Sequence, residues 1–277
     1  MCPRLFTIGP FTVYSYGLMV GIGFIIASIL LTKELKRKGL DQNLGSSITL
    51  LAVVFGISGS KILYLIENWS YFVRDPFGMA FSPGGLTWYG GLILATLVIM
   101  LYTRRKKIPF LNVCDSASPS LALGYGVARI GCHLSGDGDY GIPTDLPWGA
   151  VYSKGTFPPS KAFEEFPEIV QQYGVNGVVP DTIAVHPAPL YEFVIGVGLF
   201  LILWKLRTKY SADGKLFMMY LILSGVARFL VELIRINPRI LFGLSEAQVI
   251  ALVLACIGLI GFQILSKRQQ PMPVTST

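Results

Sequence analysis

Ionisable side chains fall within the long apolar stretches of this 277-residue sequence, and six of them are candidates for chemistry. They are Lys61, Arg129, His133, Glu192, Arg228 and Glu232. A charged group at the centre of a bilayer costs about 2.5–3.5 kcal/mol on insertion scales, and such groups are usually functional. These residues are therefore the first candidates for chemistry.

Two arginines stand out because helical spacing surrounds each with polar partners. Arg129 and His133 are four residues apart, so a helix places them on one face. Arg228, Glu232 and Arg235 are spaced by four and three residues and also share a face. Two arginines from different helices can hold one phosphate through paired hydrogen bonds, and a phospholipid head group is the phosphate most available there. An ion pair between Arg228 and Glu232 would be a purely structural arrangement. However, two arginines flank this one glutamate, so one positive charge would stay uncompensated.

The glycines around these residues allow two interpretations. In GYGVARIGCHLSGDGDYG, small residues let a ligand or another backbone approach closely. We expect the stretch from Gly131 to Gly141 to contribute to binding, because it leaves the helix together with Asp137. For Gly56 and Gly59 we expect helix packing of the small-residue kind.

The histidines and cysteines near this stretch carry less specific signals. His133 is either the proton acceptor of a reaction or a structural histidine. We expect His186 to orient the start of its helix and Cys132 to be a buried structural thiol. The four cysteines lack zinc-ligand spacing, so the sequence predicts neither a metal site nor a cofactor.

The composition indicates which elements must position these residues. Of all residues, 52% are hydrophobic and 14% are charged, against about 25% charged in soluble domains. The apolar residues form stretches close to the roughly 20 that cross a bilayer as a helix. The stretches are 14–32, 46–66, 86–103, 114–134, 188–206, 216–234 and 247–266. The sequence predicts an all-α integral membrane protein with about seven transmembrane helices.

The basic residues predict the orientation of these helices. The net charge is +7, and many of the 23 basic residues form clusters that follow the first, third, fifth and seventh stretches. By the positive-inside rule, the N-terminus is outside and the C-terminus cytoplasmic. Arg235 and Arg239 are exceptions at an outer end. No basic cluster is interleaved with exposed aromatics, which argues against nucleic-acid binding.

The domain organisation follows from the same pattern. Residues 1–277 form a single polytopic membrane domain. The segment 135–185 is long and contains seven acidic residues against two lysines, with many aromatic and proline residues. We expect it to be a folded extracytoplasmic loop subdomain.

Several of these motifs together resemble the bacterial prolipoprotein diacylglyceryl transferase family over nearly the whole chain. The matching stretches are YGLMVGIGF at 16–24, GGLTWYGGL at 84–92, ARIGCHLSGDGDYG at 128–141, HPAPLYE at 186–192 and GVARFLVELIR at 225–235. Their order and spacing agree with the family.

The resemblance implies a transferase of the bacterial cytoplasmic (inner) membrane. Its partners would be phosphatidylglycerol and preprolipoprotein signal peptides, and it would attach diacylglycerol to the lipobox cysteine. The resemblance places the essential arginines at Arg129 and Arg228 and the catalytic histidine of the family at Tyr89. His133, one turn from Arg129, is a further catalytic candidate as a possible substitute for that histidine. The other substrate-binding candidates are Tyr16, Gly131, Asp137, Glu232 and Arg235.

The sequence departs from the family at several positions. Tyr89 stands where the family has a histidine, Cys132 and Ser135 replace two asparagines, and Asp137 replaces a glutamate. Ser224 replaces a tyrosine. Because tyrosine is a poor base near neutral pH, these changes leave open a related transferase with another acceptor. A transporter and a seven-helix receptor also fit the pattern of spans, although no repeat symmetry of the transporter kind is evident.

Overall fold

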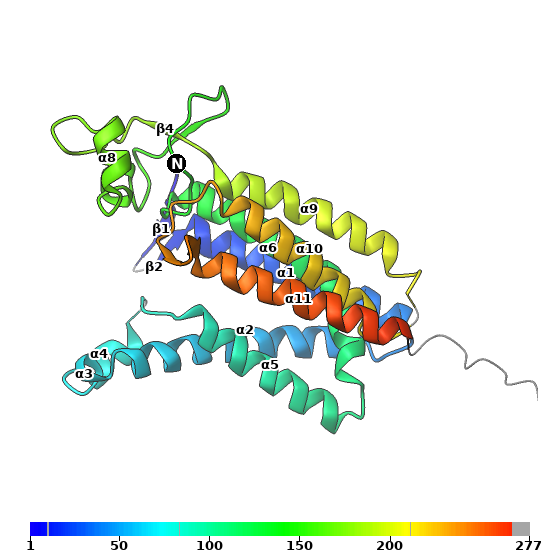
Figure 1. Ribbon diagram of the computed structural model, residues 1–277. Helices are drawn as coiled ribbons and strands as arrows, with labels where there is room; N and C mark the ends of the chain where they lie inside the picture. The colour runs from blue at the N-terminus through cyan, green and yellow to red at the C-terminus, as the bar shows by residue number, and fades with distance from the viewer. Residues whose placement is uncertain (10, 83, 211, 268–277) are drawn as a thin grey trace, which may run out of the picture. The chain divides into compact units, whose positions relative to one another are not determined.

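The computed structural model describes residues 1–9, 11–82, 84–210 and 212–267, and helices form most of them (Figure 1). The long helices are α1 (Ser15–Arg37), α2 (Asn43–Glu67), α5 (Trp88–Arg105), α6 (Phe110–Ser135), α9 (Ala188–Leu206), α10 (Lys215–Val231) and α11 (Glu246–Lys267). Short helices are α3 (Trp69–Phe72), α4 (Pro76–Phe81), α7 (Pro159–Ala162) and α8 (Pro167–Tyr173). Each predicted apolar stretch coincides with one long helix.

Four helices in the described part of the chain are long and apolar enough to cross a membrane. They are α1, α2, α9 and α11. The other three carry features that lower their mean hydropathy or length. Helix α5 ends in two arginines, α6 contains Pro119 and Asp115, and α10 has only 17 residues. The fold is thus that of a helical membrane protein, and the count of seven spans and the orientation stay predictions.

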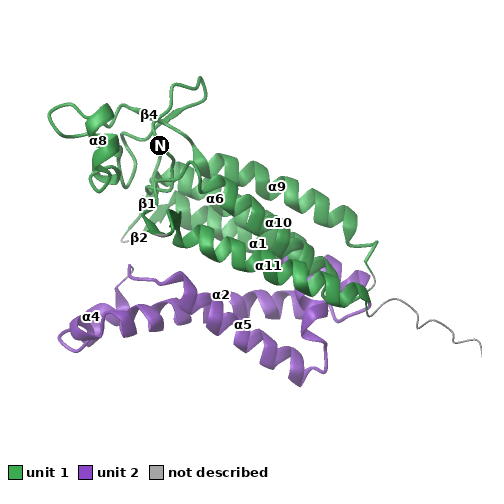
Figure 2. Cartoon of the chain, in the orientation of Figure 1, with its two compact units in different colours: residues 1–27, 117–277 green, residues 28–116 purple. Residues whose placement is uncertain are grey.

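The chain divides into two compact units (Figure 2). Unit 1 comprises residues 1–27 and 117–277, and unit 2 comprises residues 28–116. The boundaries fall within α1 and α6, so each of these helices contributes to both units. The polar network described below lies wholly in unit 1.

Glycines hold α2 and α5 together in unit 2. A Cβ atom on Gly59 would lie 2.4 Å from the carbonyl oxygen of Gly90. One on Gly91 would lie 2.5 Å from the carbonyl oxygen of Gly56. Lipid chains are as apolar as leucine side chains, so helices in a membrane associate by close packing at small residues. The packing role predicted for Gly59 is confirmed, whereas an added Cβ on Gly56 would meet nothing within 4 Å, so Gly56 contributes its carbonyl and not its small size.

Helices of unit 1 lie side by side and cross at glycines in the same way (Figure 1). Gly126 of α6 faces Gly196 of α9, where an added Cβ would lie 2.9 Å from the carbonyl oxygen of Ala122. Gly225 of α10 meets the backbone of Ala251 in α11. These close crossings fix how the helices that carry the charged residues approach their neighbours.

In the described residues, three two-stranded antiparallel sheets lie outside the helices. They are β1 (Arg4–Ile8) with β2 (Phe11–Tyr14), β3 (Ala150–Val151) with β4 (Ala184–Val185), and β5 (Arg239–Leu241) with β6 (Leu244–Ser245). The apolar pattern did not predict these hairpins, because strands of two to five residues leave too short a period to detect.

The segment between α6 and α9 has a small hydrophobic core of its own. Its buried members are Tyr140, Tyr152, Ala162, Phe163, Val179 and Val185. Tyr140 and Tyr152 stack with their ring centroids 4.5 Å apart. This core agrees with a folded loop subdomain, whose extracytoplasmic location stays a prediction.

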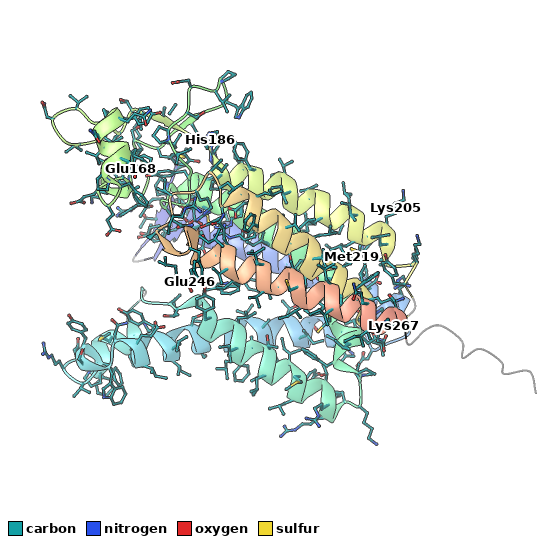
Figure 3. The ribbon with its side chains drawn as sticks, in the orientation of Figure 1. Glu168, His186, Lys205, Met219, Glu246 and Lys267 are labelled. Carbon is teal, nitrogen blue, oxygen red and sulfur yellow. The ribbon has the colours of Figure 1, made fainter. Side chains whose placement is uncertain are left out.

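Two lysines and two glutamates mark opposite ends of the helices in unit 1. Figure 3 labels Lys205 and Lys267 at one end, and Glu168, His186 and Glu246 at the other. Such a separation is typical of a membrane protein whose basic end faces the cytoplasm.

Candidate active site

The end of α6 turns sharply at two glycines. Gly136 and Gly138 adopt positive φ angles of 57° and 90°, a region that side chains with a Cβ rarely occupy. A Cβ on Gly136 would also lie 2.7 Å from the Cα of Gly155. Asp137 lies between these two turns, and Asp139 follows them.

Backbone pairing then directs this loop toward the end of α10. The amide of Gly141 donates to the carbonyl of His186 at 2.8 Å. The amide of Ile142 donates to the carbonyl of Ile234 at 2.9 Å. Because Gly141 pairs with Arg235 as a β-bridge, the preceding Asp139 is brought beside that arginine.

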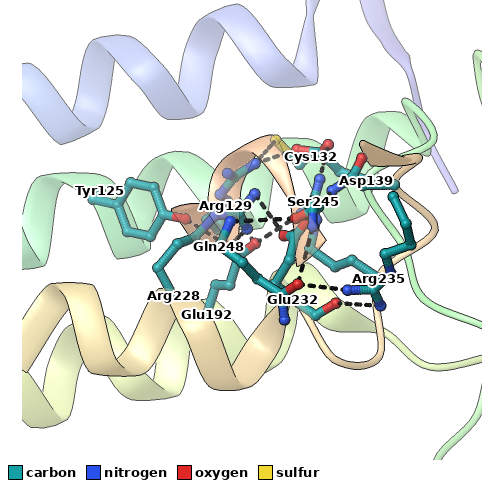
Figure 4. A network of polar contacts seen from close by, with 12 residues as sticks. Tyr125, Arg129, Cys132, Asp139, Glu192, Arg228, Glu232, Arg235, Ser245 and Gln248 are labelled. Carbon is teal, nitrogen blue, oxygen red and sulfur yellow. Dashed lines mark hydrogen bonds and ion pairs between the residues drawn. The ribbon is translucent and has the colours of Figure 1, made fainter. Parts of the chain in front are cut away.

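Three arginines and three acidic residues meet here in one network (Figure 4). They are Arg129 on α6, Asp139 on the loop, Glu192 on α9, and Arg228, Glu232 and Arg235 around the end of α10. Asp139 binds both Arg129 and Arg235. The network therefore joins α6, α9 and the end of α10.

Glu192 is the central carboxylate of the network. Its Oε1 accepts a hydrogen bond from Tyr125 at 2.6 Å and one from Arg228 at 3.0 Å. Its Oε2 lies 3.1 Å from Nε of Arg129 and 3.3 Å from Nη1 of Arg235. With only 3% of its side chain exposed, Glu192 contacts all three arginines.

Glu232 is held at the edge of the network by neutral donors as well as by charge. Its Oε2 lies 2.9 Å from Arg228 Nη2, as the four-residue spacing predicts. Its Oε1 accepts hydrogen bonds from Ser245 at 2.7 Å and Asn237 at 2.5 Å. Arg239 donates to Gln248 on α11 at 2.6 Å, so the β5–β6 hairpin is tied to the same end of α10.

The structure corrects the expected excess of positive charge. Three guanidinium groups face three carboxylates, so the network is formally neutral. Arg235 and Arg239, the exceptions to the charge pattern, are both accounted for because Arg235 binds Asp139 and Arg239 binds Gln248. Buried ion pairs of this kind are costly to break singly, because a lone partner keeps its charge without compensation.

The two aspartates of the loop have opposite electrostatic environments. Burial alone would raise the pKa of Asp139, but the guanidinium groups of Arg235 and Arg129 outweigh it and hold the pKa at about 2. Partial burial raises the pKa of Asp137, and the negative charge of Asp139 adds to this effect. A raised pKa makes the Asp137 carboxylate a better proton acceptor near neutral pH than its sequence position indicates.

His133 lies one turn beyond Arg129 and contacts the loop subdomain. Its Nδ1 is 2.8 Å from the hydroxyl oxygen of Tyr152, and the two rings meet edge to face. His186 lies 3.2 Å from the Tyr191 hydroxyl, which also accepts a hydrogen bond from Trp148. His186 therefore belongs to the junction between the subdomain and α9. Tyr152 fixes the ring orientation of His133, and Tyr191 fixes that of His186.

Tyr16 and Gly131 lie where α1 meets α6. A Cβ on Gly131 would be 3.1 Å from the Cα of Tyr16 and 3.0 Å from the Cβ of Met19, so the glycine permits close packing. The Tyr16 side chain is 48% exposed and interacts electrostatically with Asp137 and Arg129. The structure thus brings these two predicted binding residues to the border of the network.

Tyr89 belongs to unit 2. It lies in the first turn of α5 with its ring edge-on to Trp88, at a centroid distance of 5.4 Å. In the same unit, Lys61 donates to the carbonyl of Gly84 at 2.8 Å and to Ser82. Lys61 thus holds the loop that leads to α5, and the catalytic role of Tyr89 stays a prediction.

Cys132 lies beside the network as a buried thiol. Its sulfur is 3.5 Å from Arg129 Nη1, and together with Asp137 and Asp139 it brings three possible metal ligands within 4.8 Å. A cation there would face the guanidinium of Arg129, which already binds both Cys132 and Asp139. We assign these groups to the network for that reason.

Sequence reasoning named Glu192 only as a charged residue within an apolar stretch and gave it no role in the site, and it did not include Asp139 or Tyr125 among the site residues. Glu192 carried a usable signal, because a carboxylate in an otherwise apolar helix needs partners. The sequence contains no signal for Asp139 other than its negative charge, because its position depends on the pairing of the loop with the end of α10.

Comparisons with known proteins agree with the resemblance read from the motifs. A family model described as prolipoprotein diacylglyceryl transferase matches residues 3–264. A phosphatidylglycerol–prolipoprotein diacylglyceryl transferase from Clostridium tetani is 32% identical over 272 residues, covering 98% of this chain and 100% of the relative. Enzymes of the same name from Clostridioides difficile and Parasynechococcus marenigrum are each 29% identical, over 96% and 99% of this chain and 96% and 97% of their own lengths. The predicted resemblance is confirmed.

Proposed function

Because the chain belongs to the prolipoprotein diacylglyceryl transferase family, we propose that it transfers the diacylglyceryl group of phosphatidylglycerol to the lipobox cysteine of preprolipoproteins. In this reaction the cysteine sulfur forms a bond to the glyceryl carbon of the lipid. The bond between that carbon and the phosphate oxygen breaks, and glycerol phosphate leaves. The thiol proton passes to a proton acceptor or to solvent.

The observation that carries the proposal is the convergence of Arg129 and Arg228 on one anion. Both lie within 3.1 Å of the same carboxylate, Glu192, although they come from different helices. Guanidinium groups so close together can also hold two oxygens of one phosphate. Of the three arginines, these two have the more exposed side chains, at 17% and 27% against 6% for Arg235.

The arginines act on the charge that develops during the reaction. When the carbon–oxygen bond breaks, the phosphate gains one negative charge. Fixed cations near that oxygen stabilise the transition state more than the ground state, and they need no reorganisation. Because the side chains of Glu192 and Glu232 are almost fully buried, electrostatic effects beside them are stronger than they would be in solvent.

Two groups are proposed for removal of the thiol proton. In the tautomer in which Nδ1 of His133 donates to the Tyr152 hydroxyl, Nε2 is the proton acceptor of the ring, an arrangement typical of a positioned base. Asp137 is the second candidate because its pKa is raised. An unperturbed cysteine is a few per cent thiolate near pH 7, and either base would raise this fraction.

The setting of the reaction follows from the helices. We propose a multi-pass protein of the bacterial cytoplasmic membrane, with the network near the outer face, where exported signal peptides arrive. The substrates are then phosphatidylglycerol from the bilayer and the lipobox of a membrane-bound preprolipoprotein. Tyr16, Gly131, Asp137, Glu232 and Arg235 would surround the lipid head group.

Complementation tests this function directly. The full chain, expressed in a bacterium depleted of its own diacylglyceryl transferase, should restore growth and lipoprotein modification. Arg129→Ala and Arg228→Ala should each abolish rescue while the protein still accumulates in the membrane. If the wild-type chain fails to rescue and no lipobox peptide is modified in vesicles containing phosphatidylglycerol, the acceptor assignment is wrong.

A transferase with a different acceptor is the second candidate. It is favoured by the substitutions at Tyr89, Cys132 and Ser135, which alter the polar groups that the family places in its motifs. In vesicles, release of glycerol phosphate that depends on another thiol or hydroxyl acceptor, but not on a lipobox peptide, would support it.

A further inference from the structure

Glu192 lies where the two arginines of the proposed phosphate clamp converge. Its two oxygens together contact Arg129, Arg228 and Arg235, so one carboxylate fills the space between three guanidinium groups. A phosphate held by Arg129 and Arg228 would bring another negative charge against this buried carboxylate. Like charges at such distances repel strongly where the dielectric constant is low.

The three carboxylates of the network differ in what else holds them. Glu232 keeps two neutral donors, Ser245 and Asn237, whichever way the arginines turn. Asp139 lies on a loop fixed by backbone pairing and bridges two arginines from the outer side. Glu192 has a single neutral donor among the described residues, the hydroxyl of Tyr125.

The hold of the arginines on Glu192 is also incomplete. The Nε atoms of Arg129 and Arg235 are buried but form no hydrogen bond within the described structure. Nε of Arg129 lies 3.1 Å from Glu192 without the angle that a hydrogen bond requires. A buried donor left unsatisfied costs about 1–3 kcal/mol, so a better-placed anion would be favoured over this carboxylate.

We propose that Glu192 is an exchangeable counter-ion of the arginine pair, displaced onto Tyr125 when the lipid phosphate binds and returning to expel glycerol phosphate. This inference rests on the proposed function and adds a positioning residue to it. Without substrate, Glu192 keeps the arginines together and compensates their charge. After transfer, the product carries more negative charge than the lipid phosphate did, and the returning carboxylate competes with it for Arg129 and Arg228.

Removing the charge of Glu192 should separate binding from turnover. In vesicles with phosphatidylglycerol and a lipobox peptide, Glu192→Gln should lower KM for the lipid and the inhibition constant of added glycerol phosphate, each by about tenfold or more. At saturating lipid, kcat should fall because product release becomes slow. A purely structural role predicts the reverse for binding, since loosened arginines raise both constants.

Two further variants keep the proposal testable if Glu192→Gln does not fold. Tyr125→Phe preserves the ring beneath Arg129, 4.9 Å from its guanidinium carbon, but removes the donor that holds the displaced carboxylate. It should weaken inhibition by glycerol phosphate several-fold. Glu232→Gln removes an equal charge from a carboxylate that is not exchanged, and it should raise KM rather than lower it.

A matched control and a second readout distinguish the possible failures. Glu168→Gln removes one negative charge from the exposed surface of the loop subdomain and should leave all constants unchanged. Thermal stabilisation of the full-length protein by glycerol phosphate measures binding without turnover. Unchanged or weaker glycerol phosphate binding in Glu192→Gln, or an unchanged inhibition constant in Tyr125→Phe, overturns the exchange. Absence of transfer by the wild-type protein overturns the proposed function instead.

Discussion

At the scale of single residues, the planar guanidinium group allows an arginine to make several directed contacts that a lysine ammonium of equal charge cannot make. Arg129 and Arg228 each contact two or more groups of the network through different nitrogens. A lysine ammonium is a point charge that cannot make paired contacts with phosphate and carboxylate at once. The identity of these residues, and not only their charge, should therefore matter.

We expect Arg129→Lys and Arg228→Lys to lower kcat/KM for lipid transfer by at least 100-fold, equivalent to about 3 kcal/mol or more of transition-state stabilisation. The measurement is transfer to a lipobox peptide in vesicles, with membrane insertion checked by fractionation. Near-normal activity in either lysine variant would show that net charge alone suffices.

The depressed pKa of Asp139 predicts a pH-dependent contribution to stability. The pKa of Asp139 is about 2 in the folded protein, against an ordinary value of 3.8. The ionised carboxylate therefore stabilises the folded state fully at a pH above 3.8, and this stabilisation is lost as the pH falls toward 2. We expect Asp139→Asn to lower the free energy of unfolding by about 2 kcal/mol at pH 5 to 7. In detergent melting curves, the gap from wild type should narrow below pH 4. A gap that widens on acidification would contradict the ion pairing.

His133 and Asp137 are the two candidates for the group that accepts the thiol proton. If His133 is the base, His133→Gln should slow transfer at pH 7, and a higher pH should partly restore it as more acceptor thiolate forms. Tyr152→Phe should produce a smaller loss through poorer orientation of the ring. If instead Asp137→Asn produces the loss and His133→Gln matches wild type from pH 6 to 9, the carboxylate is the base.

Residue types at helical spacing predicted much of this site. Arg228, Glu232 and Arg235 were placed on one face by their spacing, and the structure finds them in contact. The partnership of Arg129 with Asp139 was not predictable, because it depends on two positive-φ glycines and a β-bridge between segments nearly 100 residues apart. Spacing reveals contacts within one element, whereas contacts between elements need the fold.

At the scale of elements, glycines determine how closely the helices that carry the network approach one another. Gly196 lies on α9 one turn from Glu192, and an added Cβ would meet the Ala122 carbonyl at 2.9 Å. Gly198 on the same helix has open space around its Cβ position. Alanine substitutions at these two positions therefore distinguish the effect of helix packing from the effect of helix propensity within α9.

We expect Gly196→Ala to destabilise the protein by about 1–3 kcal/mol and to reduce transfer, because α9 must shift and carry Glu192 away from Arg129. Gly198→Ala should be neutral or slightly stabilising, since alanine favours a helix. Melting temperature and transfer rate in the same vesicles provide the measurement. Equal behaviour of the two variants would show that the crossing at Gly196 does not position the network.

At the scale of the whole molecule, apolar stretch length was enough to locate every long helix. The boundaries differ by a few residues, because helix ends follow caps and turns that hydropathy does not detect. The division into two compact units was not predicted, since its boundaries lie inside α1 and α6, where the sequence shows no linker. The arrangement of the short hairpins also depends on tertiary pairing rather than on local pattern.

The orientation of the molecule is the last prediction, and on it depends which leaflet supplies the lipid. The basic clusters at the ends of alternate helices place Thr208 in the cytoplasm and Ser153 of the loop subdomain outside. Both residues are exposed. In a chain whose four native cysteines are replaced by serine, Ser153→Cys should react with a membrane-impermeant maleimide in spheroplasts. Thr208→Cys should react only after the membrane is opened. The opposite labelling would place the arginine network at the cytoplasmic face, where an exported lipobox cysteine has not yet arrived, and would exclude the proposed acceptor even if the lipid were still bound.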